Sequence, residues 1–136
     1  MDRAEKKAQT RKAILGAAKS LFEVDGFDAT SIRDIAAQAD VAAGTVLLHF
    51  ENKEDLLHSA LFDDLEATID DALETLPVEA SLSRQLGHIT RTMFTYYEAR
   101  PTLSRTLLEK SLFADPPWNE HFAGQVSRVH GHITSL

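Results

Sequence analysis

The sequence contains no cysteine among its 136 residues, so it offers neither disulfide bonds nor thiolate metal ligands. No apolar run approaches the roughly 20 residues that a membrane-spanning helix needs, and the charged N-terminus lacks the apolar core of a signal peptide. It has neither a glycine-rich phosphate loop nor a serine, histidine and acid set at a recognisable turn. We therefore expect a cytoplasmic protein that is not an enzyme, does not bind a membrane and carries no cofactor.

Two histidines near the C-terminus are the nearest approach to a metal site. His130 and His132 are two residues apart, so on a helix they point to different faces. An i, i+4 spacing with a third ligand would be needed for a persuasive site. We expect no metal.

Basic and acidic residues are unevenly distributed along the chain. The net charge is −7, yet residues 1–12 carry five basic and two acidic side chains, and acid is concentrated beyond residue 60. A basic tip by itself is equally typical of a solvated tail. With 43% hydrophobic and 26% charged residues, the chain has ordinary globular composition, sufficient for one domain or a small head with a short body.

Apolar residues recur at helical spacing along most of the chain. Ile14, Leu15, Ala18, Leu21 and Phe22 form one stripe, which predicts a helix from about residue 6 to residue 25, closed by a glycine. Further helices are predicted at about 53–75, 78–100 and 102–113, with a last helical segment from residue 118. No alternating strand pattern is present, so the predicted fold class is all-α.

Residues 31–53 predict two short helices, a tight turn and the start of a third helix. Ser31 with Asp34 three residues later is a helix start signal, and Asn52 begins another. Asp40 occupies the turn, where positive φ is required. Val46 and Phe50, four residues apart, would anchor the second short helix in the core. This layout is typical of a helix-turn-helix DNA reader.

These motifs resemble a known family. The runs TRKAIL-x-AA, GFDATSIRDIA and GTVLLHFENKEDLL, within positions 10–62, resemble the DNA-binding region of TetR transcriptional regulators. The resemblance implies a three-helix helix-turn-helix head at residues 1–52 and an antiparallel helical ligand-binding and dimerisation body at residues 53–136. The family usually dimerises through late helices, so we expect the chain to be a fragment or its body to be unusually short.

The resemblance and the helix N-terminus together assign candidate DNA-binding residues. Hydroxyls and free N–H groups at a helix start can bind a phosphate, and the resemblance places the other residues on or beside the groove-reading helix. The candidates are Thr30, Ser31, Arg33, Ala42, Ala43, Gly44, Thr45, Leu47, Leu48, His49 and Lys53. Helix capping by Ser31, solvated charge at Arg33 and Lys53, and packing by His49 remain open alternatives.

Four of these candidates depart from the family pattern. Ala42 and Ala43 replace a polar or basic pair, and Leu47 and Leu48 replace a tyrosine and a frequently polar residue. The loss of polar groups predicts fewer phosphate contacts and DNA binding that is weaker or more selective than usual. Leucines can still contact thymine methyl groups.

The body supplies aromatic and apolar side chains for a ligand pocket. The candidate ligand-binding residues are His88, Met93, Phe94, Tyr97, Leu107, Phe113, Trp118 and Phe122. They favour a largely hydrophobic effector, with Tyr96, Tyr97 or His88 as a polar contact. The same residues would also suit an ordinary helical core, which is the alternative reading.

Two functions remain open at this point. The first is a homodimeric, ligand-responsive repressor that binds double-stranded DNA at a palindromic operator and is released by a small molecule. The alternative is a helical protein-interaction module that kept the helix-turn-helix scaffold and uses Leu47 and Leu48 as an apolar contact.

Overall fold

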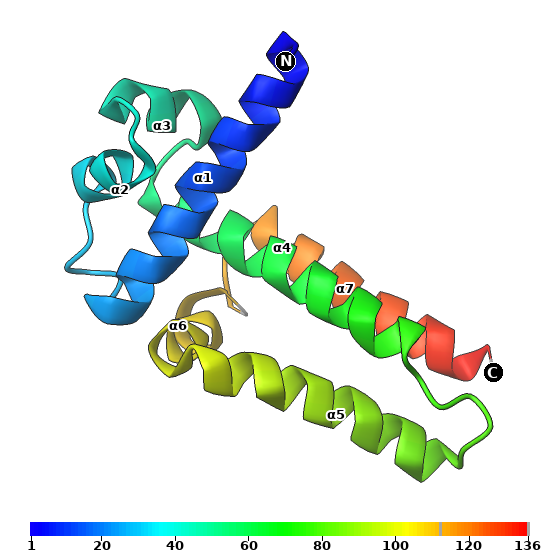
Figure 1. Ribbon diagram of the computed structural model, residues 1–136. Helices are drawn as coiled ribbons and strands as arrows, with labels where there is room; N and C mark the ends of the chain where they lie inside the picture. The colour runs from blue at the N-terminus through cyan, green and yellow to red at the C-terminus, as the bar shows by residue number, and fades with distance from the viewer. Residues whose placement is uncertain (112, 136) are drawn as a thin grey trace. The chain divides into compact units, whose positions relative to one another are not determined.

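The regular structure of the chain is helical in all the residues that can be described. The computed structural model describes residues 1–111 and 113–135, and these contain no strand (Figure 1). Over this same part of the chain, no helix is long and apolar enough to cross a membrane. The elements in chain order are α1 (Arg3–Val24), α2 (Ile32–Ala39), α3 (Ala43–His49), α4 (Lys53–Glu74), α5 (Leu82–Ala99), α6 (Pro101–Thr106), the π-helix η1 (Leu107–Ser111) and α7 (Trp118–Thr134).

The polypeptide divides into two compact units, and the division falls inside α4. Residues Met1–Leu61 form the first unit, here called the head, and Phe62–Leu136 form the second, here called the body. The predicted functional boundary at residues 52 and 53 lies nine residues earlier and stays a prediction, because contacts alone do not define function.

Side-chain caps set where the helices of the head begin. The carboxylate of Asp2 accepts a 2.7 Å bond from the N–H of Glu5, so α1 begins at Arg3, three residues before the predicted start. Ser31 and Asp34 cap α2 reciprocally, each side chain accepting from the other's backbone N–H at 3.1 Å. The predicted start signal at Ser31 is thus confirmed.

Two positive φ angles make the tight turns of the head. Gly26, after α1, has φ +86°, as the closing glycine of the predicted first helix requires. Asp40 ends α2 with φ 58° and ψ 46°, and its N–H donates to the carbonyls of Ala36 and Ala37. The turn thereby directs the chain from α2 into α3 within three residues.

The core of the head lies where its three first helices meet. Ile14, Phe22, Ile35 and Val46 are fully buried, and Phe50, the residue that ends α3, is only 3% exposed. Both predicted anchors of α3 are therefore confirmed. The guanidinium of Arg11 on α1 also lies 5.5 Å from the centre of the Phe50 ring.

The helices of the body differ from prediction in two places. α5 begins at Leu82 instead of about residue 78, because residues 77–80 form a turn in which the N–H of Ala80 donates to the carbonyl of Pro77, and Ser81 then caps the helix. The single helix expected at about 102–113 is α6 followed by the wider η1, which ends at Ser111. α7 begins at Trp118 as predicted.

Hydrogen bonds and ion pairs join the body's helices. Gln125 of α7 donates from its side-chain amide to the carbonyl of Phe62 (3.1 Å) and to the carboxylate of Glu66 (2.9 Å), and Arg128 pairs with Glu66 and Asp70. On the α5 side, Asp64 accepts from the hydroxyl of Tyr96 at 3.2 Å. In Figure 1, α4 and α7 accordingly lie side by side.

Candidate nucleic-acid interface and ligand cavity

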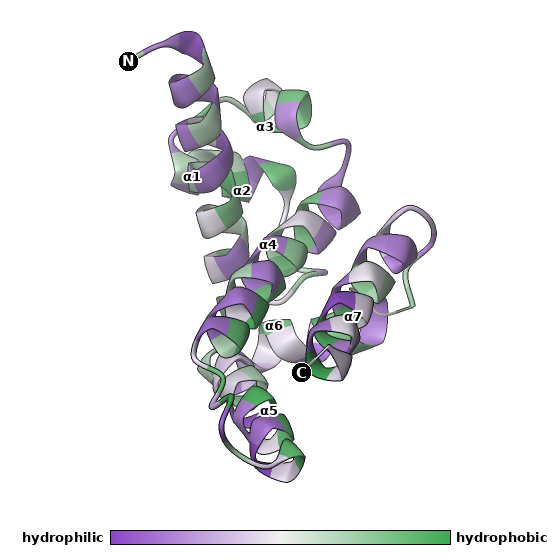
Figure 2. Ribbon diagram, turned by 90° about the vertical axis from the view of Figure 1, so that its right-hand side faces the viewer, coloured by the Kyte–Doolittle hydropathy of each residue, from purple (hydrophilic) through white to green (hydrophobic). Residues whose placement is uncertain are grey.

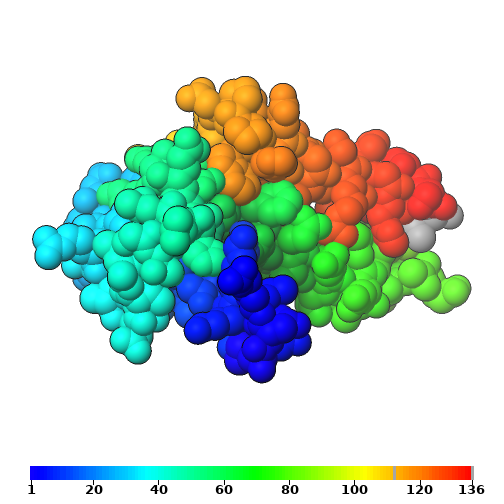
Figure 3. All heavy atoms as spheres, turned by 90° about the horizontal axis from the view of Figure 1, so that it is seen from above, coloured from blue at the N-terminus to red at the C-terminus, as the bar shows by residue number. Residues whose placement is uncertain are grey.

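The outer face of α3 is apolar and exposed. Leu47 is 52% exposed and Leu48 is 85% exposed, whereas Val46, on the inner side of the helix, is fully buried. A side chain at Gly44 would meet no atom within 4 Å, so the surface in front of this residue is open. Ala42, which precedes the helix, forms no side-chain cap bond. Figure 2 shows hydrophobic colour on α3, and Figure 3 shows α2 and α3 at the surface of the head.

Four further candidates lie on α2 and α3. Arg33 is exposed on α2, while Ala43, Thr45 and His49 on α3 are half-buried. The imidazole of His49 lies 6.3 Å from the Phe50 ring, centre to centre. The structure therefore brings an open guanidinium and a threonine hydroxyl to the same part of the head as the exposed leucines.

Two candidates at the start of α2 form bonds within the head. Thr30 is 2% exposed, and its hydroxyl donates to the carbonyl of Gly26 at 2.8 Å. Ser31 uses its hydroxyl oxygen to cap α2 and holds the pKa of the Asp34 carboxyl below its usual range by hydrogen bonding. The hydroxyl of Thr30 is thus directed into the protein, and contact with a phosphate here would fall to Ser31 and the backbone.

Lys53, the first residue of α4, also contacts the head's own backbone. Its ammonium donates to the carbonyl of Phe27 at 2.8 Å and lies 4.3 Å from the centre of that residue's ring. These contacts join the loop after α1 to the start of α4. Lys53 therefore holds two segments of the head together, and the DNA contact predicted for it stays a prediction.

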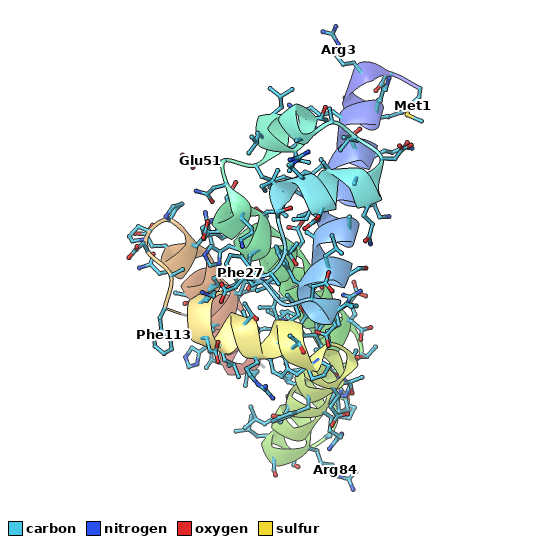
Figure 4. The ribbon with its side chains drawn as sticks, turned by 90° about the vertical axis from the view of Figure 1, so that its left-hand side faces the viewer. Met1, Arg3, Phe27, Glu51, Arg84 and Phe113 are labelled. Atoms are coloured by element: carbon cyan, nitrogen blue, oxygen red, sulfur yellow. The ribbon has the colours of Figure 1, made fainter. Side chains whose placement is uncertain are left out.

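Sequence reasoning left one set of cations without a role. Arg3, Lys6, Lys7 and Lys12 are exposed along α1, and the side chain of Arg3 extends from the free end of the helix (Figure 4). The excess of basic residues in positions 1–12 was the available signal. Because these cations lie on the same unit as α3, they can contribute to binding a polyanion.

A mostly apolar cavity of about 370 Å³ lies in the body, between α4, α5 and α7. Its size falls in the range of small-molecule pockets. The lining residues are Leu65, Ile69, Ala72, Leu73, Ile89, Met93, Tyr97, Phe122, Gln125, Val126, Val129, His130 and Ile133. Burial raises the pKa of the Tyr97 hydroxyl, so this group stays protonated and able to donate a hydrogen bond.

Three of the eight predicted ligand-binding residues line this cavity: Met93, Tyr97 and Phe122. The other five lie elsewhere. Phe94 is 57% exposed, Phe113 is 83% exposed and Leu107 is buried away from the cavity. Trp118 packs against Phe62 with ring centres 6.0 Å apart, and His88 bonds to the hydroxyl of Thr75 at 2.9 Å. Figure 4 shows Phe113 pointing outward.

Apart from Phe122, sequence reasoning missed the residues that α7 contributes to the cavity. Gln125, Val126, Val129, His130 and Ile133 all line it. Their spacing of one, three or four residues is the signal of one helix face, and it was available in the sequence. What the sequence could not show is that this face lies opposite Tyr97 of α5.

Comparison with known proteins agrees with this geometry. The family model described as "Bacterial regulatory proteins, tetR family" matches residues 14–60, which contain α2, α3 and the turn between them. The chain belongs to the TetR family. The resemblance inferred from residues 10–62 is thereby confirmed, as is the all-α fold with a helix-turn-helix head and a helical body.

Individual TetR-family relatives extend the similarity beyond the head. The HTH-type transcriptional repressor KstR of Rhodococcus jostii is 36% identical over 110 residues, which are 79% of this chain and 50% of that protein. KstR of Mycolicibacterium smegmatis is 32% identical over 136 residues, 97% of this chain and 63% of that protein. A TetR-family regulator of Marinobacter aquaeolei superposes with a TM-score of 0.73 at 26% identity, covering 98% of this chain and 69% of that one. The chain thus spans half to about two thirds of the curated relatives' lengths.

Proposed function

We propose that this chain is the DNA-reading and effector-sensing part of a transcriptional repressor. The observation that carries the proposal is α3: its inner side is fixed by the buried Val46 and Phe50, while its outer face is unobstructed. A helix held in this way can enter the major groove as a rigid element. The repressor relatives and the family match support the same function.

The predicted contacts divide into two groups under this proposal. Arg33, Gly44, Thr45, Leu47 and Leu48 would face the DNA, since they are open or lie beside the open face. Thr30 and Lys53 would act by holding the start of α2 and of α4 in place, because their polar atoms bond to backbone carbonyls. Ala42, Ala43, Ser31 and His49 would contribute close packing against the DNA backbone.

The cavity in the body would hold the effector. Its lining predicts a largely hydrophobic small molecule, with Tyr97 and His130 as candidate polar contacts. Effector binding would release the DNA if it favoured a conformation in which the heads no longer fit the operator. The proposed activity is binding alone, with no chemical reaction.

A palindromic operator requires two heads, so we propose a homodimer. Helix-turn-helix dimers contact two half-sites about one helical turn apart, and each protomer supplies one reading helix. The place of action would be the bacterial cytoplasm, where the DNA lies. Sedimentation of the purified protein, with and without operator DNA, measures the predicted association.

Selection of genomic DNA fragments by the purified protein tests DNA reading. A palindromic site should be enriched, and Arg33→Ala should weaken its binding at least tenfold without changing the helical circular dichroism. Arg84→Ala is the matched control, because it removes the same charge from an exposed position in the body. Absence of enrichment at low salt, or equal effects of the two variants, would contradict the proposal.

A cavity-filling variant tests effector sensing. Val129→Trp places a bulky ring in the cavity, so hydrophobic compounds that raise the melting temperature of the wild type should no longer do so. Leu86→Trp is the control, since Leu86 is 46% exposed and does not line the cavity. If Val129→Trp retains full ligand binding, the effector site lies elsewhere.

The exposure of Leu47 and Leu48 is the observation that favours the alternative, a protein-interaction module. The same selection experiment separates the two functions. A protein that enriches no DNA, and whose leucine variants lose a protein partner, would support the module.

A further inference from the structure

The reading face of α3 lacks the side chains with which helices usually recognise bases. Over Ala43–His49 the sequence is AGTVLLH, so Thr45 and His49 are the sole polar side chains of the helix, and both are half-buried. Arginine, lysine, asparagine and glutamine, the residues that pair with guanine and adenine edges, are absent from it. Hydrogen bonding from α3 therefore gives little sequence discrimination.

What α3 does present is a compact apolar ridge. Leu47 and Leu48 follow Gly44 by three and four residues, so the three share one face of the helix. Gly44 lies in open space, which lets the helix backbone approach a surface closely, and the two leucines extend past it with 52% and 85% of their area exposed. We call this face, Gly44 with Leu47 and Leu48, the leucine ridge.

The major groove has one group that suits such a ridge. Each base pair presents donors and acceptors there, and thymine alone adds an apolar group, the C5 methyl. A leucine pressed on a donor or acceptor would remove its water and supply no partner, which is unfavourable. A leucine pressed on a methyl group buries apolar surface on both sides, which is favourable.

We propose that the leucine ridge reads thymine C5 methyl groups in each operator half-site and thereby determines specificity. This inference rests on the proposed DNA-binding function and names the chemical group recognised at that interface. Leu48, the more exposed of the two, makes the dominant contact. Because a methyl contact involves no charge, its contribution to affinity is the same at low and high salt, in contrast to phosphate contacts.

Replacement of thymine by deoxyuridine tests the inference, since it removes the C5 methyl and leaves base pairing intact. Operator duplexes carrying one such replacement at a time are titrated with the full chain by fluorescence anisotropy. We expect about a fourfold rise in Kd at the contacted positions, the value for burying one methyl group, and no change at the others. Unmodified operator binding is measured in parallel as the test of the proposed function itself.

A variant in the ridge identifies the residue responsible. Leu48→Ala should weaken binding to the thymine operator and show no further loss with the deoxyuridine operator, because the contact is already absent. Val24→Ala is the matched control: Val24 is 80% exposed on α1 of the same head, and its variant should retain the full deoxyuridine effect.

Several results would overturn the inference. One is binding of unmodified operator with no deoxyuridine effect at any position, which leaves the proposed function standing. A deoxyuridine effect that persists in Leu48→Ala also overturns it, since the methyl would then act through DNA shape. Leu48→Ala binding that equals the wild type does so too and leaves the leucines available to a protein partner. Absence of binding to any DNA overturns this inference and the proposed function together.

Discussion

At the scale of single residues, Ala42 lacks the capping side chain that would stabilise the start of α3. It precedes α3 with extended φ and ψ of −72° and 150°, the conformation of a capping residue, but has no side chain to bond the free N–H groups. We predict that Ala42→Ser raises the free energy of unfolding by about 1 kcal/mol, measured by urea denaturation. Ala37→Ser, inside α2, is the control and should give no gain; equal gains would show that capping is not the cause.

His58 makes the fold sensitive to mild acid. This side chain is 8% exposed, and burial lowers its pKa below the usual 6.5, against the opposing effect of the Asp55 and Glu54 carboxylates. Below pH 6.5 the unfolded chain takes up a proton that the folded chain does not, so the free energy of unfolding falls as the pH falls.

Substitution of His58 should remove that component of the pH dependence. We predict that His58→Gln declines less steeply than the wild type between pH 6.5 and pH 5, as followed by thermal melts at each pH. His130→Gln, at an exposed position, is the control and should follow the wild type. Identical slopes for all three proteins would exclude His58 as the sensitive group.

At the scale of helices and turns, Lys53 connects the start of α4 to the loop after α1. We predict that Lys53→Met lowers the free energy of unfolding by about 1–2 kcal/mol, because it removes the bond to the Phe27 carbonyl and the cation above the ring. Lys12→Met, on the exposed side of α1, should leave stability unchanged. If Lys53→Met lost DNA binding alone, its role would be direct contact with phosphate.

Gly44 tests whether the open surface of α3 serves binding or folding. A methyl group here meets no atom within 4 Å, so Gly44→Ala should keep or raise stability, by up to about 1 kcal/mol from helix propensity. Operator affinity should nevertheless fall, since the added methyl separates the helix from the DNA. Unchanged affinity would mean that α3 approaches DNA less closely than proposed.

At the scale of the whole molecule, a net charge of −7 and an apolar reading face limit electrostatic binding. Two phosphate contacts by cations in each protomer of a dimer would give a slope of log K against log salt of about −4. We predict a slope no steeper than this in operator titrations from low to moderate salt. A slope near −8 would show many more phosphate contacts and contradict the predicted weakness.

Local chemistry explains which elements were predictable. Ser31, Asp34 and Asn52 are capping residues whose hydrogen bonds span three positions. The starts of α2 and α4 can therefore be predicted from residues that are close together in the sequence. The predicted start of α5 was wrong by about four residues, because residues 78–80 carry no strong start or stop signal. The side-chain amide of Gln85, inside the helix, binds the carbonyls of Val78 and Ala80 in the preceding turn. The DNA-binding residues and the domain boundary stay predictions.

The sequence by itself determined the all-α fold, the helix-turn-helix head and the apolar character of α3, because helical period, caps and side-chain type are local properties. Tertiary structure decided which side chains come together. It placed Lys53 on the Phe27 carbonyl and set α7 beside Tyr97 to form the cavity, leaving Trp118 and Phe113 outside it. These pairings join residues far apart in the chain, and no local pattern encodes them.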